Sequence, residues 1–340
     1  MTHTLTLFVA IAILGANVPA SAQPPRDRKT PDTDQTIAVA RGARLTIDNF
    51  AGEVVIRTEA RDTLRVTARH SARNKVDIQT TAAGVVIRSR GSAGPASVDY
   101  EITAPHWMPI KVSGTYNFVS VEGAQSEVSA ETVRGDIVVK GGTGFVTAKS
   151  IEGEVIVEGA KGRVNASSVN EGVRITGASG DIVAETTNGD IALTRIESQS
   201  VEVTTVNGDV VYEGSIAANG RYRFATHNGD VTLGVPETAN ATFTVRSYNG
   251  EFSNNLGLKA VGEPRRGRRS TYVIGTGAAE VELESFSGEV RIRRAGTLPP
   301  SKTKGEDHAH ASEASQFGVS FFPDRRGPGG ACQPAAISVF

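Results

Sequence analysis

The sequence predicts an all-β fold, a single-chain parallel β-solenoid with two to three short strands in each rung of about 19 residues. Three observations predict it. A short phrase recurs at a nearly fixed spacing, and apolar and polar residues alternate strictly on both sides of that phrase. Between residues 110 and 294 the only prolines are Pro236 and Pro264, which favours unbroken strand ladders.

The repeated phrase is Asn-Gly-Asp, or a close relative, between two strand-like runs. Its copies are centred on Gly52, Gly135, Gly153, Gly172, Gly189, Gly208, Gly229, Gly250 and Gly288. Asn117 takes the place of glycine in one further copy. Among residues other than glycine, Asn best tolerates a left-handed backbone. A second glycine-rich turn follows about nine residues after most copies, so each rung contains at least two strands. The longer gap after Gly250 predicts one degenerate rung before Gly288.

Three polar columns accompany the glycine. Thr or Ser stands three residues before it, and Asn often stands one residue before it, at Asn188, Asn207, Asn228 and Asn249. Asn170 belongs to the same column, because one residue is inserted before Gly172. By alternation we expect both columns to face inward, with the Asn side chains hydrogen-bonded from rung to rung. An acidic residue follows the glycine, at Glu53, Asp136, Glu154, Asp190, Asp209, Asp230, Glu251 and Glu289. Stacked carboxylates suggest cation binding, but turn formation explains the same residues and is the favoured interpretation.

A fourth, mostly apolar column stands two residues before the glycine. Its members are Phe50, Thr115, Val133, Ile151, Val169, Thr187, Val206, His227, Tyr248 and Phe286. If Asn and Thr point inward, this column points outward and forms a candidate interaction surface. If the register shifts at the corner, the same residues are ordinary core or half-buried corner positions.

A basic run interrupts the predicted degenerate rung at Arg265, Arg266, Arg268 and Arg269. It predicts a protruding loop. Such a loop is suited to contact anionic glycan, lipopolysaccharide or membrane headgroups. A solvated loop with no partner is the alternative.

The two ends of the chain differ from the repeats. An apolar run at residues 5–14 and the small residues Ala20-Ser21-Ala22 predict a signal peptide over residues 1–22 and export to the periplasm or cell surface. The run is too short for a typical transmembrane helix, so no membrane span is expected in the mature chain. A linker over 23–35 then leads to the solenoid at 36–294, and residues 295–340 form a polar tail. The tail has an apolar stretch that either caps the solenoid or stays free, and a single cysteine, Cys332, with no partner for an internal disulfide.

These features resemble a bacterial family known as "putative adhesins", exported β-solenoid domains of unknown function. The resemblance rests on the opening 45–56, the strand 100–105, the serial Asn-Gly-Asp rungs and the closing segment 275–292. It covers roughly residues 36–294. It implies the solenoid fold and an adhesin-like role, and it implies no catalytic residues.

Catalytic motifs find little support in the sequence. It has no Gly-x-Ser-x-Gly, no His-Glu-x-x-His and no phosphate-binding loop, so no cofactor or metal is expected. A formal net charge of −1 argues against nucleic acid as a partner. Two hypotheses remain: an exported, non-enzymatic envelope protein that binds or spaces something, and a polysaccharide lyase or hydrolase built on a β-helix. An active site would break the repeat locally with clustered carboxylates.

Overall fold

The computed structural model describes residues 32–262 and 269–296, and these residues form strands and connecting turns without a helix. The chain divides into two units, Met1–Leu298 and Pro299–Phe340, and every described residue belongs to the first. The expected signal peptide, most of the expected linker and residues 297–340 lie outside the described residues. Because the described part is all strand and turn, it offers no helix able to cross a membrane.

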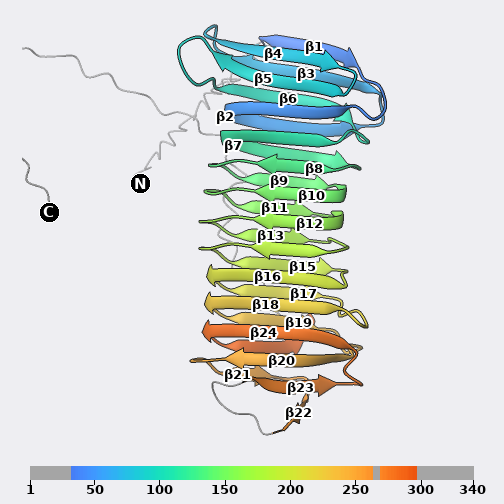
Figure 1. Cartoon of the computed structure of the whole chain (residues 1–340), viewed down its shortest axis with the longest axis vertical. Coiled ribbons are helices and arrows are strands. Elements are labelled where there is room, and N and C mark those ends of the chain that lie inside the picture. The colour runs from blue at the N-terminus through green and yellow to red at the C-terminus, as the bar shows by residue number, and fades with distance from the viewer. Residues whose placement is uncertain (1–31, 263–268, 297–340) are drawn as a thin grey trace, which may run out of the picture. The chain divides into compact units, whose positions relative to one another are not determined.

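The middle of the molecule consists of two parallel ladders of strands (Figure 1). The first ladder contains β8 (Val128–Glu131), β10 (Thr143–Lys149), β12 (Lys161–Ser167), β14 (Ile182–Glu185), β16 (Ser200–Asn207) and β18 (Arg221–Asn228). The second contains β9 (Ile137–Gly141), β11 (Val155–Glu158), β13 (Val173–Thr176), β15 (Ile191–Ile196), β17 (Val210–Gly214) and β19 (Val231–Val235). Each rung, one full coil of the chain, adds one strand to each ladder. The predicted parallel β-solenoid is therefore confirmed, with two strands in each rung.

The core lies between the two ladders, because every second side chain of each strand points toward the other ladder. In the middle rungs the first ladder contributes alternating Val and Ala, for example Val146 and Ala148, both buried. Toward the C-terminal rungs these small residues give way to larger ones. Phe224 packs against Tyr212 with ring centroids 4.9 Å apart. The core side chains of the first ladder therefore become larger from the middle rungs to the C-terminal rungs.

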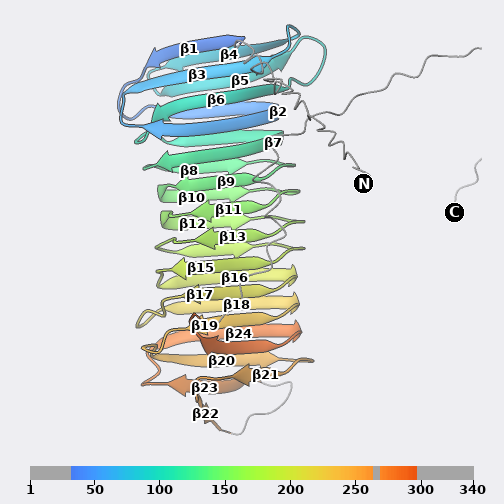
Figure 2. The same cartoon turned by 180° about the vertical axis from the view of Figure 1, so that it is seen from behind.

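The N-terminal end is antiparallel at its outer edge (Figure 2). Its strands are β1 (Thr33–Ala38), β2 (Arg44–Glu59), β3 (Thr63–His70), β4 (Asn74–Thr81), β5 (Gly84–Gly91), β6 (Val98–Pro105) and β7 (Ile110–Ala124). The long strand β2 pairs in parallel with β7 on one side and with β5 and β6 on the other. β4 then covers β5, β3 covers β6 and β1 covers β3, all antiparallel. The first strand begins at Thr33, inside the expected linker.

The C-terminal end departs from the predicted order of rungs. Its strands are β20 (Ala241–Ser247), β21 (Phe252–Asn254), β22 (Lys259–Val261), β23 (Ser270–Ile274), β24 (Ala279–Ser287) and β25 (Val290–Arg294). The last repeat, β24 and β25, inserts between β18–β19 and β20–β21 (Figure 1). The rung of Gly288 thus lies between those of Gly229 and Gly250, and the expectation that it follows Gly250 in space is wrong. The predicted degenerate rung is the antiparallel pair β22–β23, which extends beyond β20.

Candidate interaction surface

Glycine occupies the repeated corner because the neighbouring rung lies against its Cα. A Cβ on Gly208 would lie 2.0 Å from the carbonyl oxygen of Gly189, and a Cβ on Gly229 would lie equally close to that of Gly208. No side chain fits at such distances. Asn117 fills the same corner differently from the prediction, since its φ is not positive. Its buried amide instead donates from Nδ2 to the backbone oxygen of Asn49 at 2.6 Å.

The Thr/Ser column faces inward, as predicted, and fastens each corner to the previous rung. Thr205 Oγ1 donates to the carbonyl of Gly189 at 3.1 Å, and Thr226 Oγ1 donates to that of Gly208 at 2.9 Å. Both threonines are buried. Ser285 does the same in the inserted rung, donating to Gly229 at 2.9 Å. Each hydroxyl therefore satisfies a carbonyl that the turn would otherwise leave unpaired.

The Asn column forms the predicted ladder but faces solvent. Asn207 Nδ2 donates to Asn188 Oδ1 at 2.8 Å, and Asn228 Nδ2 donates to Asn207 Oδ1 at 2.8 Å. The ladder continues more weakly from Asn188 to Asn170 at 3.3 Å. The expectation that these residues share the inward face with Thr is wrong. The strict alternation of the strand ends at the buried Thr, because the chain turns the corner over the next residues.

Members of the acidic column hydrogen-bond from rung to rung at the corner, which the turn-formation interpretation did not predict. Asp190 Oδ1 accepts the backbone N–H of Asp209 at 2.8 Å, and Asp209 Oδ1 accepts that of Asp230 at 2.9 Å. Asp230 Oδ1 in turn accepts the N–H of Glu289 in the inserted rung at 2.8 Å. Arg291 donates to Glu289, and this lowers the pKa of that carboxyl. In the described residues no three His, Cys, Asp or Glu side chains are placed to hold a metal ion.

The column two residues before the glycine is exposed, and we call it the corner column. Its members in spatial order are Phe50, Thr115, Val133, Ile151, Val169, Thr187, Val206, His227, Phe286 and Tyr248. Val133 is 42% exposed, Ile151 45%, Val206 41% and Tyr248 38%. The alternative that these residues are ordinary core is therefore wrong. At about 4.8 Å between strands, the column extends for roughly 40 Å along the ladder.

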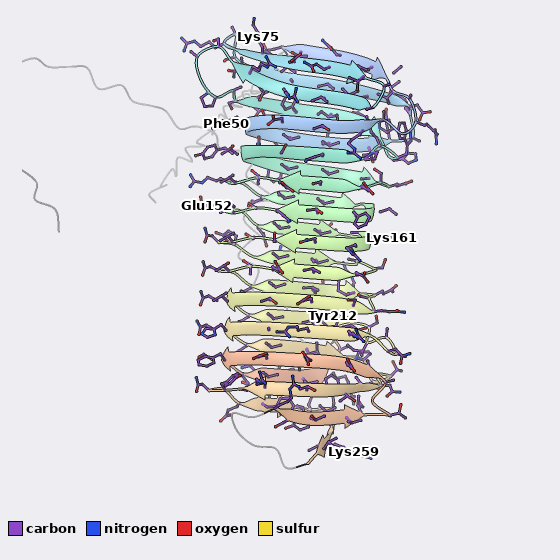
Figure 3. All side chains as sticks on the ribbon, in the orientation of Figure 1. Phe50, Lys75, Glu152, Lys161, Tyr212 and Lys259 are labelled. Carbon is purple, nitrogen blue, oxygen red and sulfur yellow. The ribbon has the colours of Figure 1, made fainter. Side chains whose placement is uncertain are left out.

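Aromatic rings lie at both ends of the corner column. His227 and Phe286 stack with centroids 4.7 Å apart and planes 7° apart, and Tyr248 lies 5.3 Å beyond Phe286. At the other end Phe50 contacts Tyr116 at 5.5 Å. Figure 3 places Phe50 and Glu152 at the same edge of the stack, with Lys161 at the opposite edge. The corner column is thus a projecting ridge.

Tyr116 is a surface residue that the sequence reasoning missed. It is 48% exposed and lies in the Asn column, next to Arg134, whose guanidinium is 5.6 Å from the ring centroid. Arg134 itself pairs with Glu152 on the next rung. The frame set by Asn117 could have found Tyr116, because it places this tyrosine one residue before the turn.

Of the four arginines in the basic run, the structure describes Arg269. Arg269 forms an ion pair with Glu282 at 3.4 Å. Arg265, Arg266 and Arg268 lie outside the described residues. The predicted protruding loop therefore stays a prediction.

Comparisons with known proteins give one family match. The model of the Toastrack DUF4097 family matches residues 43–293. A solved structure from Clostridium sporogenes, described as a "putative cell adhesion protein", covers 77% of this chain and 99% of its own, with 10% identity and a TM-score of 0.24. A TM-score this low supports no argument about function. A comparison with curated proteins finds no match.

Proposed function

The chain belongs to the Toastrack DUF4097 family, as the sequence resemblance predicted, and from that premise we propose that it is an exported, non-enzymatic protein of the cell envelope. In this proposal the corner column binds a protein partner at the cell surface. The observation that carries it is the exposed row of apolar side chains, repeated in register from rung to rung. A contiguous exposed apolar stripe is typical of an interaction site.

The shape and charge of the ridge favour a protein with an apolar groove as the partner. Phe286 has His227 stacked on one side and Tyr248 5.3 Å away on the other, so the faces of this ring are not open to a sugar. Charges beside the column are paired within the protein, since Arg134 binds Glu152 and Arg246 binds Glu284 at 3.4 Å. Apolar contact supplemented by the neighbouring Asn amides is the interaction that remains.

The non-enzymatic part of the proposal is supported by the hydrogen-bond partners of the repeated carboxylates. A polysaccharide lyase or hydrolase would need carboxylates aimed at a substrate. Asp190, Asp209 and Asp230 instead accept backbone N–H groups of the next rung. Turnover of an envelope polysaccharide by the purified protein, abolished by a single substitution, would overturn this part.

Binding to isolated cell envelope tests the ridge. The triple variant Val133→Asp, Ile151→Asp and Val206→Asp places three charges on exposed positions, so it should fold normally. We expect it to lose at least tenfold in affinity for envelope in a sedimentation assay. Phe145→Ser is the matched control, because Phe145 is 55% exposed but lies outside the corner column.

Treatment of the envelope identifies the kind of partner. Protease treatment should abolish binding of the unmodified protein, and periodate oxidation of glycans should leave it intact. Equal binding by the triple variant and the unmodified protein would contradict the role of the ridge. Export is tested separately, by the cellular fraction in which the chain is found with and without residues 1–22.

A further inference from the structure

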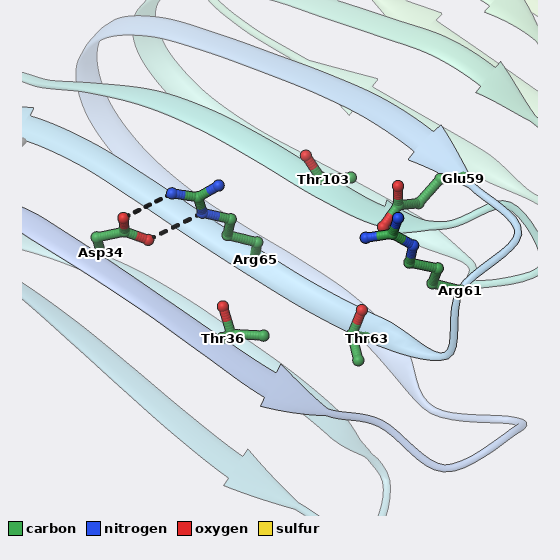
Figure 4. Close-up of a pocket in the computed structure, with 7 residues that line it drawn as sticks. All are labelled: Asp34, Thr36, Glu59, Arg61, Thr63, Arg65 and Thr103. Atoms are coloured by element: carbon green, nitrogen blue, oxygen red, sulfur yellow. Dashed lines mark hydrogen bonds and ion pairs between the residues drawn. The ribbon is translucent and has the colours of Figure 1, made fainter.

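A polar hollow of about 540 Å³ lies at the N-terminal end of the molecule, on the outer faces of β1, β3 and β6. Its lining residues are Asp34, Thr36, Glu59, Arg61, Thr63, Arg65 and Thr103 (Figure 4). Every lining residue is polar, whereas most sites for apolar ligands are lined by apolar side chains.

The hollow is framed by one firm ion pair. Arg65 donates from Nε to Asp34 Oδ1 at 3.0 Å and from its terminal nitrogen to Asp34 Oδ2 at 2.8 Å. Figure 4 shows this two-point contact between neighbouring strands. It joins β1 to β3 and fixes one wall of the hollow. Because Arg65 is occupied, it is not the group that would capture a ligand.

The other charged wall carries two groups that are still available. Arg61, in the turn between β2 and β3, has no ion pair within the described residues, and neither does the carboxylate of Glu59 at the end of β2. Thr63 and Thr103 add hydroxyls to the same hollow. A free guanidinium offers a two-point site for a carboxylate, and a free carboxylate accepts hydroxyl hydrogens.

We propose that this hollow binds an acidic saccharide, with Arg61 holding the sugar carboxylate and Glu59, Thr63 and Thr103 holding its hydroxyls. Both signs of charge and several hydroxyls meet in one hollow, which suits a ligand that carries an anion and many hydroxyl groups. The site is separate from the corner column and does not depend on the protein partner proposed for that column.

Calorimetric titration of the full chain tests the site. The probes are tetramers of galacturonic acid and of mannuronic acid, with the methyl ester of each as its uncharged counterpart. We expect at least one acidic tetramer to bind and its ester to bind at least tenfold more weakly. Arg61→Gln should weaken binding at least tenfold, and Glu59→Gln should weaken it several-fold.

Two controls separate this site from general effects. Arg73→Gln removes an exposed arginine that does not line the hollow, and it should bind as the unmodified protein does. The triple variant of the corner column should also bind normally, so failure of either proposal is distinguishable from failure of the other. The proposal is overturned if neither acidic tetramer binds, if the esters bind equally well, or if folded Arg61→Gln, checked by circular dichroism, retains full affinity.

Discussion

The middle rungs and the two ends of this molecule differ in the order of their strands and in the direction of strand pairing. From β8 to β19 the order of strands in space is their order in the sequence, and all pairing within each ladder is parallel. At the ends the order is broken, because β2 lies between β7 and the β5–β6 rung, and β24 lies between β18 and β20. The outermost strands there pair antiparallel.

This difference shows how the pairing of a repetitive ladder ends. A parallel ladder leaves an open edge at each end, and an open edge is a template for pairing with another chain. Here antiparallel strands of the same chain cover β5 and β6 at the N-terminal end and β20 at the C-terminal end. The first and last repeats, β2 and β24–β25, each lie between parallel strands, so they are held on both sides. Four predictions test this contrast, beginning with the largest expected effect.

Removal of the inserted rung should be far more damaging than removal of a middle rung. Deleting residues 279–294 takes away Val281, Leu283, Val290 and Ile292, all buried, and leaves β18–β19 and β20–β21 without the rung that joins them. The connection 236–240 crosses that rung in the native fold, so the strands on either side must rearrange before they can pair with each other. We expect this variant to be unfolded or aggregated by circular dichroism and size-exclusion chromatography.

Deleting residues 155–172 is the matched comparison. Val155 and Val173 occupy equivalent register positions, so β9 can pair with β13 and β10 with β14 after the deletion. We expect a folded protein that unfolds cooperatively, because in a repeat array each rung contacts its neighbours alone. Unfolding of both deletion variants to the same extent would contradict the distinction between middle and ends.

Substitution of a corner glycine should be the next largest effect. Gly208→Ala places a Cβ 2.0 Å from a backbone oxygen of the next rung, and we expect a loss of about 3 kcal/mol or more in the free energy of unfolding. Gly42→Ala, near the N-terminal end, meets nothing within 4 Å and should cost about 1 kcal/mol from its positive φ alone. Urea denaturation measures both, and similar losses would show that close approach does not explain the corner.

The buried hydroxyl of the corner should contribute less. Thr226→Val removes the donor to the carbonyl of Gly208 and leaves that oxygen without this partner, at a cost of about 1 to 2 kcal/mol. Thr187→Val alters an exposed residue of the corner column and should change the free energy of unfolding by less than about 0.5 kcal/mol. A larger loss for Thr187→Val in thermal or urea unfolding would reverse the assignment of inward and outward columns.

The smallest effect concerns acid stability at the N-terminal end. Hydrogen bonds from Arg65 lower the pKa of Asp34. A lowered pKa in the folded state stabilises the protein above the ordinary pKa of about 4, and this contribution is lost as the pH falls through the lowered value. Asp34→Asn should therefore lose less stability between pH 7 and pH 3 than the unmodified protein. An identical pH dependence in urea titrations would contradict the role of this pair.

The regular part of the fold could be predicted because its information is local. Alternation around glycines such as Gly189 and Gly208 sets which side chains are buried, and the Thr column is inward as expected. The Asn ladder was foreseen, but its exposure was not. Alternation is a rule for strands, and it no longer applies where the chain turns between Thr205 and Gly208.

The order of the end rungs could not be predicted for a different reason. The segment at Gly288 has the same apolar positions as any other rung, so it is able to pair beside several of them. In the structure it lies between β18–β19 and β20–β21, while β23 covers the other edge of β20. The hollow at Arg61 was likewise hidden, because Asp34, Arg61 and Thr103 are far apart in the sequence and meet through antiparallel pairing.

The inserted last repeat also constrains how the chain acquires its structure. A ladder built strictly in sequence order could close from the N-terminus while later residues are still being delivered. Here β18 and β20 both pair with β24, which lies far along the sequence from β18. Asn228, for example, pairs with Ser287. Such a long closure is slow relative to local pairing. The rung between β18 and β20 can therefore close only once β24 and β25, the last strands of the described residues, are available.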